Sequence, residues 1–413
     1  MRTQRLFQAA FVLAAILGAA APMTADTTIT GEKLGAFFKI TVPASWNGDL
    51  VISNHGFDFN PPAANPDLGP LAPLMLSEGY AVAASSYSNC CWTLFSTQQD
   101  LNRLVGIVTA NFGAPNNVIL HGFSLGGIIT AQGVEKLGGV NVSGAFPACG
   151  ALSGSRSWDG AIDLRLVYDA VCTGVAGGTL PGGATGLPSP GFPSGGMSVG
   201  AIATAVNTCT GVLTPPAFRT PAQTARLNLL KSVTLIPESF IVTDMVFVTN
   251  GLSNVIFAPD KLDGGQGVGN VGVTYNDAGI DASIQRVAYD TTARKRLEKN
   301  FTPKGAVNAT KIVSLHTDGD GLVIVENEES YADVVPAANL TTAIVNETGN
   351  THCGFNALEL VAGWESLRGW IAGDPQPTAA SIQGLCLFLG GGASCRIDPA
   401  FVVGEFDSRI PPR

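Results

Sequence analysis

The chain has 413 residues, of which 46% are hydrophobic and 13% are charged. This composition excludes a disordered or fibrous protein, and the length is sufficient to bury a large core. The net charge of −9 and the lack of a basic patch exclude nucleic acid as an expected partner.

The first 25 residues have the pattern of a signal peptide. Arg2 and Arg5 precede an uncharged run over 6–21, and small residues follow it, with Ala25 as the expected cleavage point. The run is shorter than the ~20 apolar residues that a membrane span needs, which disfavours the alternative of an uncleaved anchor. We therefore expect a secreted or periplasmic protein with no stable membrane span.

Short apolar runs alternate with amphipathic segments in the first part of the chain. The expected strands cover 36–42, 49–53, 80–86 and 117–120, and the expected helices cover 71–78, 96–111 and 125–137. The alternation resumes with strands over 311–315 and 343–345 and a helix over 355–371. This pattern predicts an α/β fold with a mostly parallel sheet that is covered by helices on both faces.

The alternation stops near residue 151. Residues 151–305 include long Gly-, Pro- and Ser-rich stretches with some helical segments, such as 220–232, and are too long for a plain loop. We interpret them as an inserted cap or lid. The predicted organisation is a signal peptide (1–25), a first core part (26–150), the cap (151–305), a second core part (306–375) and a C-terminal extension (376–413) stapled by a disulfide.

Residues 122–126 read Gly-Phe-Ser-Leu-Gly, and they join an expected strand to an expected helix. A Gly-x-Ser-x-Gly motif in this context is typical of a nucleophile elbow, in which a strained turn exposes the serine hydroxyl. The N–H groups at the start of the helix favour a developing oxyanion near that hydroxyl. Ser124 is the expected nucleophile, and a Gly-rich turn with an idle serine is the alternative.

A serine nucleophile needs a base, and the chain has only four histidines. His121 lies on the strand before the elbow and is expected to pack below the turn. His55 follows an early strand, and His316 ends a later one. His352 follows the last strand, just before the final large helix, where a loop can bring an imidazole over the sheet edge. His352 is therefore the expected base.

The base needs a carboxylate that holds its tautomer. Asp318 and Asp320 come directly after the strand at 311–315, and the chain order of serine, aspartate and histidine is the one found in α/β-hydrolases. From position alone, either aspartate could serve. A calcium loop is the alternative for this Asp-Gly-Asp-Gly run, but further ligands at the proper spacing are missing.

The oxyanion and the substrate need further groups around the serine. The expected oxyanion donors are the N–H groups of Leu125 and Phe57, and Gly56 permits close backbone approach. An ordinary strand-end turn is the alternative for this early loop. The expected substrate pocket includes His55, Trp92 and Phe123. The aromatic candidates for an acyl or aryl pocket, with core packing as the alternative for each, are Trp92, Phe95, Phe192 and Phe257.

Eight cysteines fit an exported protein, and none forms a CxxC pair, so we expect no metal and no cofactor. Two pairings are expected, Cys386 with Cys395 and Cys172 with Cys209. The partners of the other four stay open, and these are Cys90, Cys91, Cys149 and Cys353.

The chain resembles the esterase and lipase branch of the α/β-hydrolase superfamily, and in particular bacterial exported hydrolases with a Pro-Ala-x-Trp-Asn-Gly segment, here 43–48. Further matching stretches are 79–83, 122–127, 319–323 and 351–355. The matches cover about 30–150 and 305–375, and neither the cap nor the C-terminal tail has a match.

The resemblance implies the identity of several site residues. It selects Asp320 over Asp318 as the acid, because an apolar pair follows Asp320 two residues later. It implies an oxyanion hole of the simpler two-donor kind, because Phe57 follows His-Gly where many lipases have His-Gly-Gly-Gly. Cys353 departs from many esterases, and a disulfide from it, for example to Cys91, would stiffen the histidine loop.

These features predict an exported serine hydrolase that cleaves small-molecule or polymeric carboxylic esters through an acyl-enzyme intermediate. A serine peptidase or amidase, or a polyester depolymerase, would use the same fold and triad. The alternative from another class is a non-catalytic binding protein, and the intact order of Ser124, Asp320 and His352 argues against it.

Overall fold

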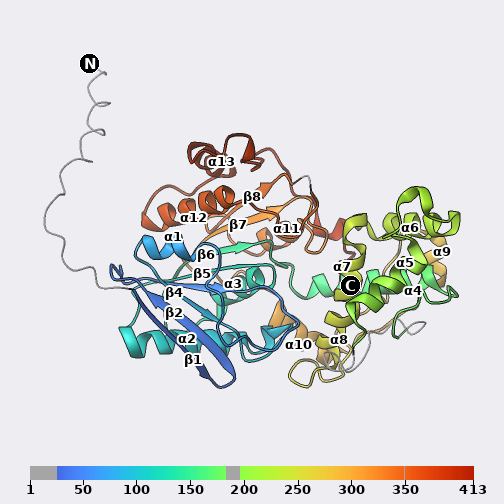
Figure 1. Ribbon diagram of the computed structural model, residues 1–413, viewed down its shortest axis with the longest axis horizontal. Coiled ribbons are helices and arrows are strands. Elements are labelled where there is room, and N and C mark those ends of the chain that lie inside the picture. The colour runs from blue at the N-terminus through green and yellow to red at the C-terminus, as the bar shows by residue number, and fades with distance from the viewer. Residues whose placement is uncertain (1–25, 183–195, 348) are drawn as a thin grey trace, which may run out of the picture.

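The protein is described by a computed structural model that covers residues 26–182, 196–347 and 349–413, so the expected signal peptide lies outside the described residues. Its centre is an eight-stranded sheet in the order β1-β2-β4-β3-β5-β6-β7-β8 (Figure 1). β2 runs antiparallel to β1 and β4, and the other pairs are parallel. The strands are β1 (Thr27–Lys33), β2 (Ala36–Val42), β3 (Leu50–Asn54), β4 (Ala81–Ser85), β5 (Val118–Phe123), β6 (Val142–Ala148), β7 (Lys311–Thr317) and β8 (Leu340–Val345).

Helices cover both faces of the sheet, and the strand residues alternate between the two resulting cores. Leu50 and Ile52 of β3 belong to the core on the side of α2 (Thr97–Phe112) and α3 (Leu125–Lys136). Val51, between them, packs into the core on the other side. That second core is covered by α1 (Ala72–Ser77), α12 (Ala357–Ala372) and α13 (Ala379–Phe388). Burial on both faces explains why the central strands are almost entirely apolar.

The predicted fold class is confirmed, because the sheet is mostly parallel and is covered by helices on both faces. Two strands escaped the sequence reading for different reasons. β1 has the sequence TTITGEK and is mostly exposed at the sheet edge, so it lacks an apolar run. β6 is buried, but its sequence VSGAFPA contains Gly144 and Pro147, which are unfavourable inside strands.

The described part of residues 151–305 contains helices and no strand, and most of it lies to one side of the sheet (Figure 1). We call these residues the cap segment, and its boundaries as a domain remain a prediction. Its helices are α4 (Ser155–Cys172), α5 (Val199–Thr210), α6 (Pro221–Thr234), α7 (Ile241–Val246), α8 (Leu252–Phe257), α9 (Ala278–Ser283) and α10 (Thr291–Phe301). A disulfide joins Cys172 at the end of α4 to Cys209 in α5, which confirms that expected pairing.

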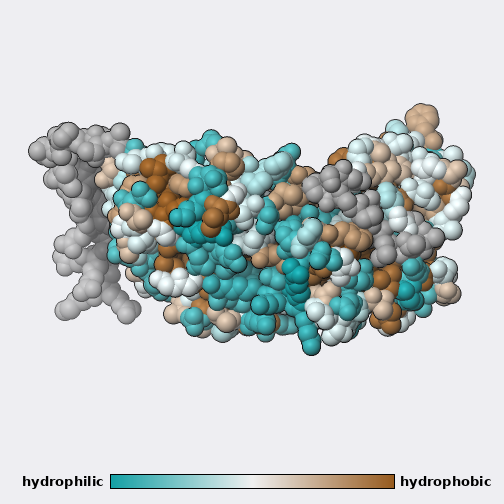
Figure 2. Space-filling view, turned by 90° about the horizontal axis from the view of Figure 1, so that it is seen from below, coloured by the Kyte–Doolittle hydropathy of each residue, from teal (hydrophilic) through white to brown (hydrophobic). Residues whose placement is uncertain are grey.

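One helical stretch of the described chain, Glu238–Phe257, is long and apolar enough to cross a membrane by length and composition alone. However, 78% of its most apolar window is buried inside the protein, as in a core helix. On the face shown in Figure 2, hydrophilic residues dominate the middle, and hydrophobic residues form separate patches towards the ends. This face therefore has no continuous apolar belt.

The C-terminal tail connects the two parts of the molecule. The Cys386–Cys395 disulfide forms as expected near its start, at α13, whereas the end of the chain lies among the cap helices (Figure 1). The Nη1 of Arg409 donates to Glu326 of the core at 2.8 Å, and its Nη2 donates to the carbonyl oxygen of Leu235 in the cap segment at 3.3 Å. The tail thus bridges the second core part and the cap segment.

The last residue, Arg413, inserts its side chain into the cap segment. Only 2% of this side chain is exposed, and its Nη2 lies 2.6 Å from the Oδ1 of Asp163 on α4. Asp159, one turn earlier, is buried within 3.8 Å of the same guanidinium and also pairs with Arg294 at 2.7 Å. The buried carboxylates of α4 therefore depend on a charge delivered by the tail.

We expect Arg413→Ala to lower the free energy of unfolding by about 3 kcal/mol or more, because it leaves a buried carboxylate without its cation. Urea denaturation measures this change. Asp407→Ala is a matched control, since the Asp407 side chain in its ion pair with Arg156 is 56% exposed and should cost less than about 1 kcal/mol. Equal effects of both substitutions would contradict a clamping role for Arg413.

Candidate active site

Ser124 occupies a sharp turn between β5 and α3. Its backbone has φ 57° and ψ −122°, a strained combination for a residue other than glycine. The turn needs small neighbours, because a Cβ at Gly122 or Gly126 would collide with the carbonyl oxygen of Asn54 in β3. The local sequence therefore fixes Ser124 at the carboxyl edge of the sheet with its hydroxyl free to meet another loop.

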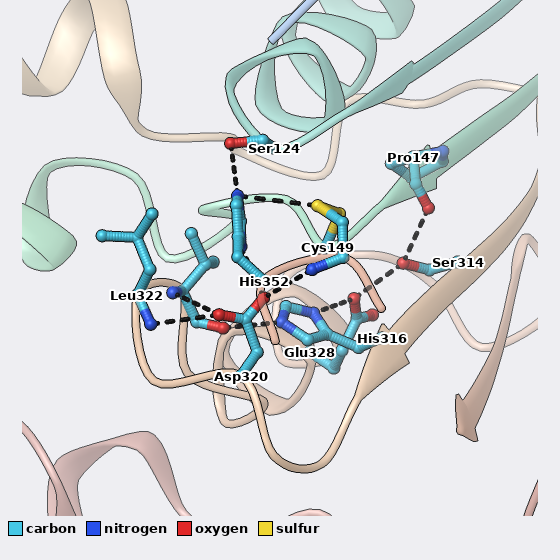
Figure 3. The surroundings of a disulfide bond; sticks show 11 residues. Ser124, Pro147, Cys149, Ser314, His316, Asp320, Leu322, Glu328 and His352 are labelled. Atoms are coloured by element: carbon cyan, nitrogen blue, oxygen red, sulfur yellow. Dashed lines mark hydrogen bonds and ion pairs between the residues drawn. A yellow bond between two sulfur atoms is a disulfide. The ribbon is translucent and has the colours of Figure 1, made fainter. Parts of the chain in front are cut away.

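The hydroxyl of Ser124 meets the imidazole of His352, which in turn meets Asp320 (Figure 3). The Nε2 of His352 lies 2.7 Å from the Oγ of Ser124, and its Nδ1 lies 2.6 Å from the Oδ2 of Asp320. The Asp320 side chain is fully buried, and 23% of the His352 side chain is exposed. The three side chains predicted as a triad thus form one continuous hydrogen-bonded chain.

The two neighbouring aspartates have different partners. The Oδ1 of Asp320 accepts hydrogen bonds from the N–H groups of Leu322 and Val323, both at 3.0 Å, which fixes the carboxylate toward His352. Asp318 instead accepts from the N–H of Glu347 at 2.7 Å and so ties the acid loop to the segment that leads to His352. The geometry thus agrees with the choice of Asp320 that the resemblance implied.

A disulfide fastens the histidine loop to the sheet. Cys353, next to the candidate base, pairs with Cys149, which directly follows β6. The carbonyl oxygen of Ala148 accepts from the N–H of Ser124 at 3.0 Å, so the disulfide ties His352 to the strand end beside the nucleophile. The suggested Cys353–Cys91 pairing is wrong, because Cys91 pairs with its neighbour Cys90.

A second histidine–carboxylate pair lies behind the acid loop (Figure 3). The Nδ1 of His316 is 3.1 Å from Glu328 on α11 (Asn327–Ala332), and its Nε2 is 2.8 Å from the carbonyl oxygen of Val323. Burial alone would lower the pKa of His316, but Glu328, together with the smaller effects of Asp320 and the carbonyl of Val323, raises it above the ordinary value of 6.5. The protonated ring can donate to both partners, and it holds the turn whose N–H groups orient Asp320.

The rings of the remaining two histidines contact groups other than Ser124. His121 is fully buried, bonds Ser53 at 3.2 Å, and has its pKa lowered by burial to about 4, so it is neutral. His55 stacks on Tyr87, and burial lowers its pKa as well. His121 thus packs below the turn, whereas His55, expected in the substrate pocket, is held by its contact with Tyr87.

The candidate oxyanion donors lie beside the nucleophile. A Cβ built on Gly56 would lie 3.6 Å from the Cβ of Ser124, so this early loop passes directly next to the serine. Within the described residues, the N–H groups of Phe57 and Leu125 donate to no protein acceptor. Both groups are therefore available to a ligand, and their role as an oxyanion hole remains a prediction.

A cavity of about 330 Å³ opens from Ser124 toward the cap segment, a size typical of small-molecule sites. Its wall is largely apolar and includes the aromatic side chains of Phe57, Trp92, Trp158, Phe247 and Phe301. The tail also contributes to it, through Phe406 and Ile410. The cavity is thus built from the early loops, the cap segment, the acid loop and the tail.

The pocket expectations need correction in part. Trp92 lines the cavity, but His55 and Phe123 do not. His55 is held against Tyr87, and Phe123 faces His121 and Phe355 in the core on the other side of the elbow. Phe95 and Phe257 also lie outside the cavity wall, and Phe192 lies outside the described residues.

One group of side chains is compact enough to be considered for a metal ion. Ligand atoms of Asp320, His352 and Cys353 all lie within 4.8 Å of one another. The sulfur of Cys353 is bonded to Cys149, however, so it is no thiolate ligand, and both His352 nitrogens already have hydrogen-bond partners. The chemistry of this donor set favours the triad over a metal centre.

We expect a Cys149→Ser and Cys353→Ser double variant to lose about 2–4 kcal/mol of stability. Its kcat/KM for a short ester should fall on the order of tenfold, because the His352 loop loses its tie beneath Ser124. Denaturation curves and ester turnover measure the two effects. The matching pair Cys386→Ser and Cys395→Ser, at the C-terminal extension, should keep its kcat/KM. An unchanged kcat/KM in the first variant would contradict a positioning role of its disulfide.

The His316–Glu328 pair predicts a pH-dependent contribution to stability. The folded pKa of His316 is raised above 6.5, so the contribution is fully present below about pH 6.5 and is lost as the pH rises through the folded pKa. Glu328→Gln should therefore destabilise the protein most near pH 6 and less at pH 9, as measured by urea denaturation. Glu329→Gln on the same helix is the control, and an equal pH trend in both variants would refute the assignment.

Comparisons with known proteins found similar structures but no match to the sequence. No protein-family model matches the sequence, and no curated protein matches it. Among solved structures, the chain is similar to the esterase Pf2001 of Pyrococcus furiosus (12% identity, 86% of this chain and 94% of that chain, TM-score 0.38). It is also similar to an esterase of Aspergillus oryzae (11% identity, 85% of this chain and 80% of that chain, TM-score 0.45). A third similar structure is the rice cell wall degrading esterase LipA of Xanthomonas oryzae (13% identity, 84% of this chain and 87% of that chain, TM-score 0.39). On its own strand order and helix cover, the chain has the α/β-hydrolase fold.

Proposed function

We propose that this protein is a serine hydrolase that cleaves carboxylic esters through an acyl-enzyme intermediate. The observation that carries the proposal is the continuous hydrogen-bonded chain from Ser124 through His352 to Asp320, with distances of 2.7 and 2.6 Å. A nucleophile, a base and an orienting carboxylate in this order supply what acyl transfer requires. The cavity beside Ser124 supplies room for a small ester.

In the proposed mechanism, the Oγ of Ser124 attacks the ester carbonyl carbon while the Nε2 of His352 takes the hydroxyl proton. The N–H groups of Leu125 and Phe57 stabilise the oxyanion of the tetrahedral intermediate. His352 then returns the proton to the leaving alcohol as the C–O bond breaks. Water enters, His352 removes its proton, and the same steps release the acid and free Ser124.

Asp320 has a positioning role in this scheme. Its Oδ2 accepts the Nδ1–H of His352, which leaves the Nε2 lone pair directed at Ser124. When His352 becomes an imidazolium, the buried carboxylate stabilises the new charge. The two N–H groups that donate to the other carboxylate oxygen keep Asp320 in this orientation throughout the cycle.

Export is part of the proposal. The four disulfides are compatible with an extracellular protein, since such bonds persist in oxidising compartments. The signal-peptide pattern of the first 25 residues supports a secreted or periplasmic location.

Ser124→Ala should reduce kcat for p-nitrophenyl butyrate by about 10⁴-fold or more, because the nucleophile is lost. A fluorophosphonate probe should label the wild-type protein at Ser124 and should not label this variant. Full activity of the folded variant would refute the proposal.

The neighbouring aspartates offer a matched test of the acid. Asp320→Asn should lower kcat by about 10⁴-fold, because the amide no longer selects the required tautomer of His352. Asp318→Asn should stay within a few-fold of wild type, since its side-chain oxygen can still accept from Glu347. The reverse order of effects in this turnover assay would reject Asp320 as the acid.

A further inference from the structure

The cavity beside Ser124 contains a buried carboxyl group that the proposed mechanism does not use. Asp244 lies on α7 and is 6% exposed, and it lines the same cavity as Ser124. Within the described residues, its buried Oδ1 has no hydrogen-bond partner. Buried polar groups are nearly always paired, so an unpaired carboxyl in a ligand cavity indicates a partner that arrives from outside.

The other carboxyl group in the cavity wall, that of Asp163, has its partners within the protein. Asp163 accepts from the hydroxyl of Tyr275 at 2.6 Å and pairs with Arg413 at 2.6 Å. Both partners belong to the protein, so Asp163 needs nothing from a ligand. The contrast separates Asp244 from Asp163 in the same cavity wall.

The surroundings of Asp244 favour its neutral, protonated form. Burial, and then the negative charge of Asp320, raise the pKa of Asp244 well above its ordinary value of 3.8. A neutral carboxyl group has one O–H donor and a carbonyl acceptor. The turn that follows, with Phe247 and Val248, adds only apolar surface to the cavity wall. Asp244 is thus a single two-sided hydrogen-bonding group in a largely apolar compartment.

We propose that Asp244 determines substrate specificity by binding a hydroxyl group on the arm of the ester that enters this cavity. A hydroxyl fits because it can accept a hydrogen bond from the O–H of the protonated carboxyl group and donate one to the other carboxyl oxygen. Both carboxyl oxygens are then paired, and neither partner has to carry a charge. The substrate class is therefore a hydroxy-substituted ester with an otherwise apolar arm. This inference rests on the proposed ester hydrolysis at Ser124, and it adds the feature of the substrate that the cavity selects.

Two matched ester pairs test the proposal, one for each arm of the substrate. Methyl 3-hydroxybutyrate is compared with methyl butyrate, and 3-hydroxybutyl acetate with butyl acetate, by pH-stat titration of the purified full chain. In the wild type, the hydroxylated ester of one pair should have a kcat/KM at least about tenfold higher than its unsubstituted partner, because an ester without the hydroxyl leaves the buried acid unpaired. In Asp244→Leu this ratio should fall to about one.

Two further variants check the cause of any change. Asp244→Asn keeps a hydrogen-bond donor and an acceptor, so it should retain part of the preference for the hydroxylated ester. Its ratio should therefore lie between those of the wild type and Asp244→Leu. Val248→Ala changes the same wall without changing its hydrogen bonding, so its ratio should stay within about twofold of wild type. Each ratio is taken within one protein and is normalised to Ser124 labelling by a fluorophosphonate, which cancels losses of active protein.

Three outcomes would overturn the proposal. One is a ratio near one for both pairs in the wild type, which needs no variant to fold. Another is the wild-type ratio persisting in Asp244→Leu. The third is a preference for choline butyrate over its neutral 3,3-dimethylbutyl analogue that Asp244→Asn abolishes, which would assign a cation to Asp244. If one of these outcomes occurs while the wild type is still labelled at Ser124 and still hydrolyses butyl acetate, only the role of Asp244 has failed. If the wild type is neither labelled nor active on butyl acetate, the proposed ester hydrolase itself is rejected.

Discussion

The candidate site depends on one hydrogen bond between the Oγ of Ser124 and the Nε2 of His352, two side chains that lie 228 residues apart. Neither residue can form it unless the sheet brings the carboxyl ends of β5 and β8 to the same edge. The parallel order β5-β6-β7-β8 does this, because all four strands release their loops on one side. The meeting of Ser124, Asp320 and His352 is therefore the product of a single topological constraint.

Loops are mobile by default, so the alignment needs ties beyond the sheet. The structure provides one tie for each member of the triad. The strained turn and its glycines fix Ser124, the N–H groups of the acid loop fix Asp320, and the Cys149–Cys353 disulfide fixes His352. The His316–Glu328 pair supports Asp320 indirectly, because His316 bonds the carbonyl oxygen of Val323 in the loop that holds Asp320. Most of these groups lie behind Ser124, Asp320 and His352, and they act on the proposed chemistry only through the positions of these three side chains.

The sequence predicted the parts of this arrangement that are encoded locally. An apolar run that ends in Gly-x-Ser-x-Gly predicts both a buried strand and a turn, and the few histidines left little choice of base. What it missed depends on contacts between distant segments. Cys149 and Cys353 are 204 residues apart, and no local pattern pairs them. β1 is an exposed edge strand without an apolar run, and His55 and Phe123 occur next to motif residues but turn away into other packing.

The substrate cavity shows why specificity is harder to predict than chemistry. Its wall combines the early loops, the cap segment, the acid loop and the C-terminal tail. The sequence around Asp244 does not distinguish this aspartate from an ordinary acidic residue of a helix. Its character comes from burial and from the nearby Asp320, both of which exist only after folding. The tail closes this compartment and is itself held by Arg413 against Asp163. The sheet therefore fixes the positions of Ser124, Asp320 and His352, whereas the cap segment, the loops and the tail shape the cavity beside them.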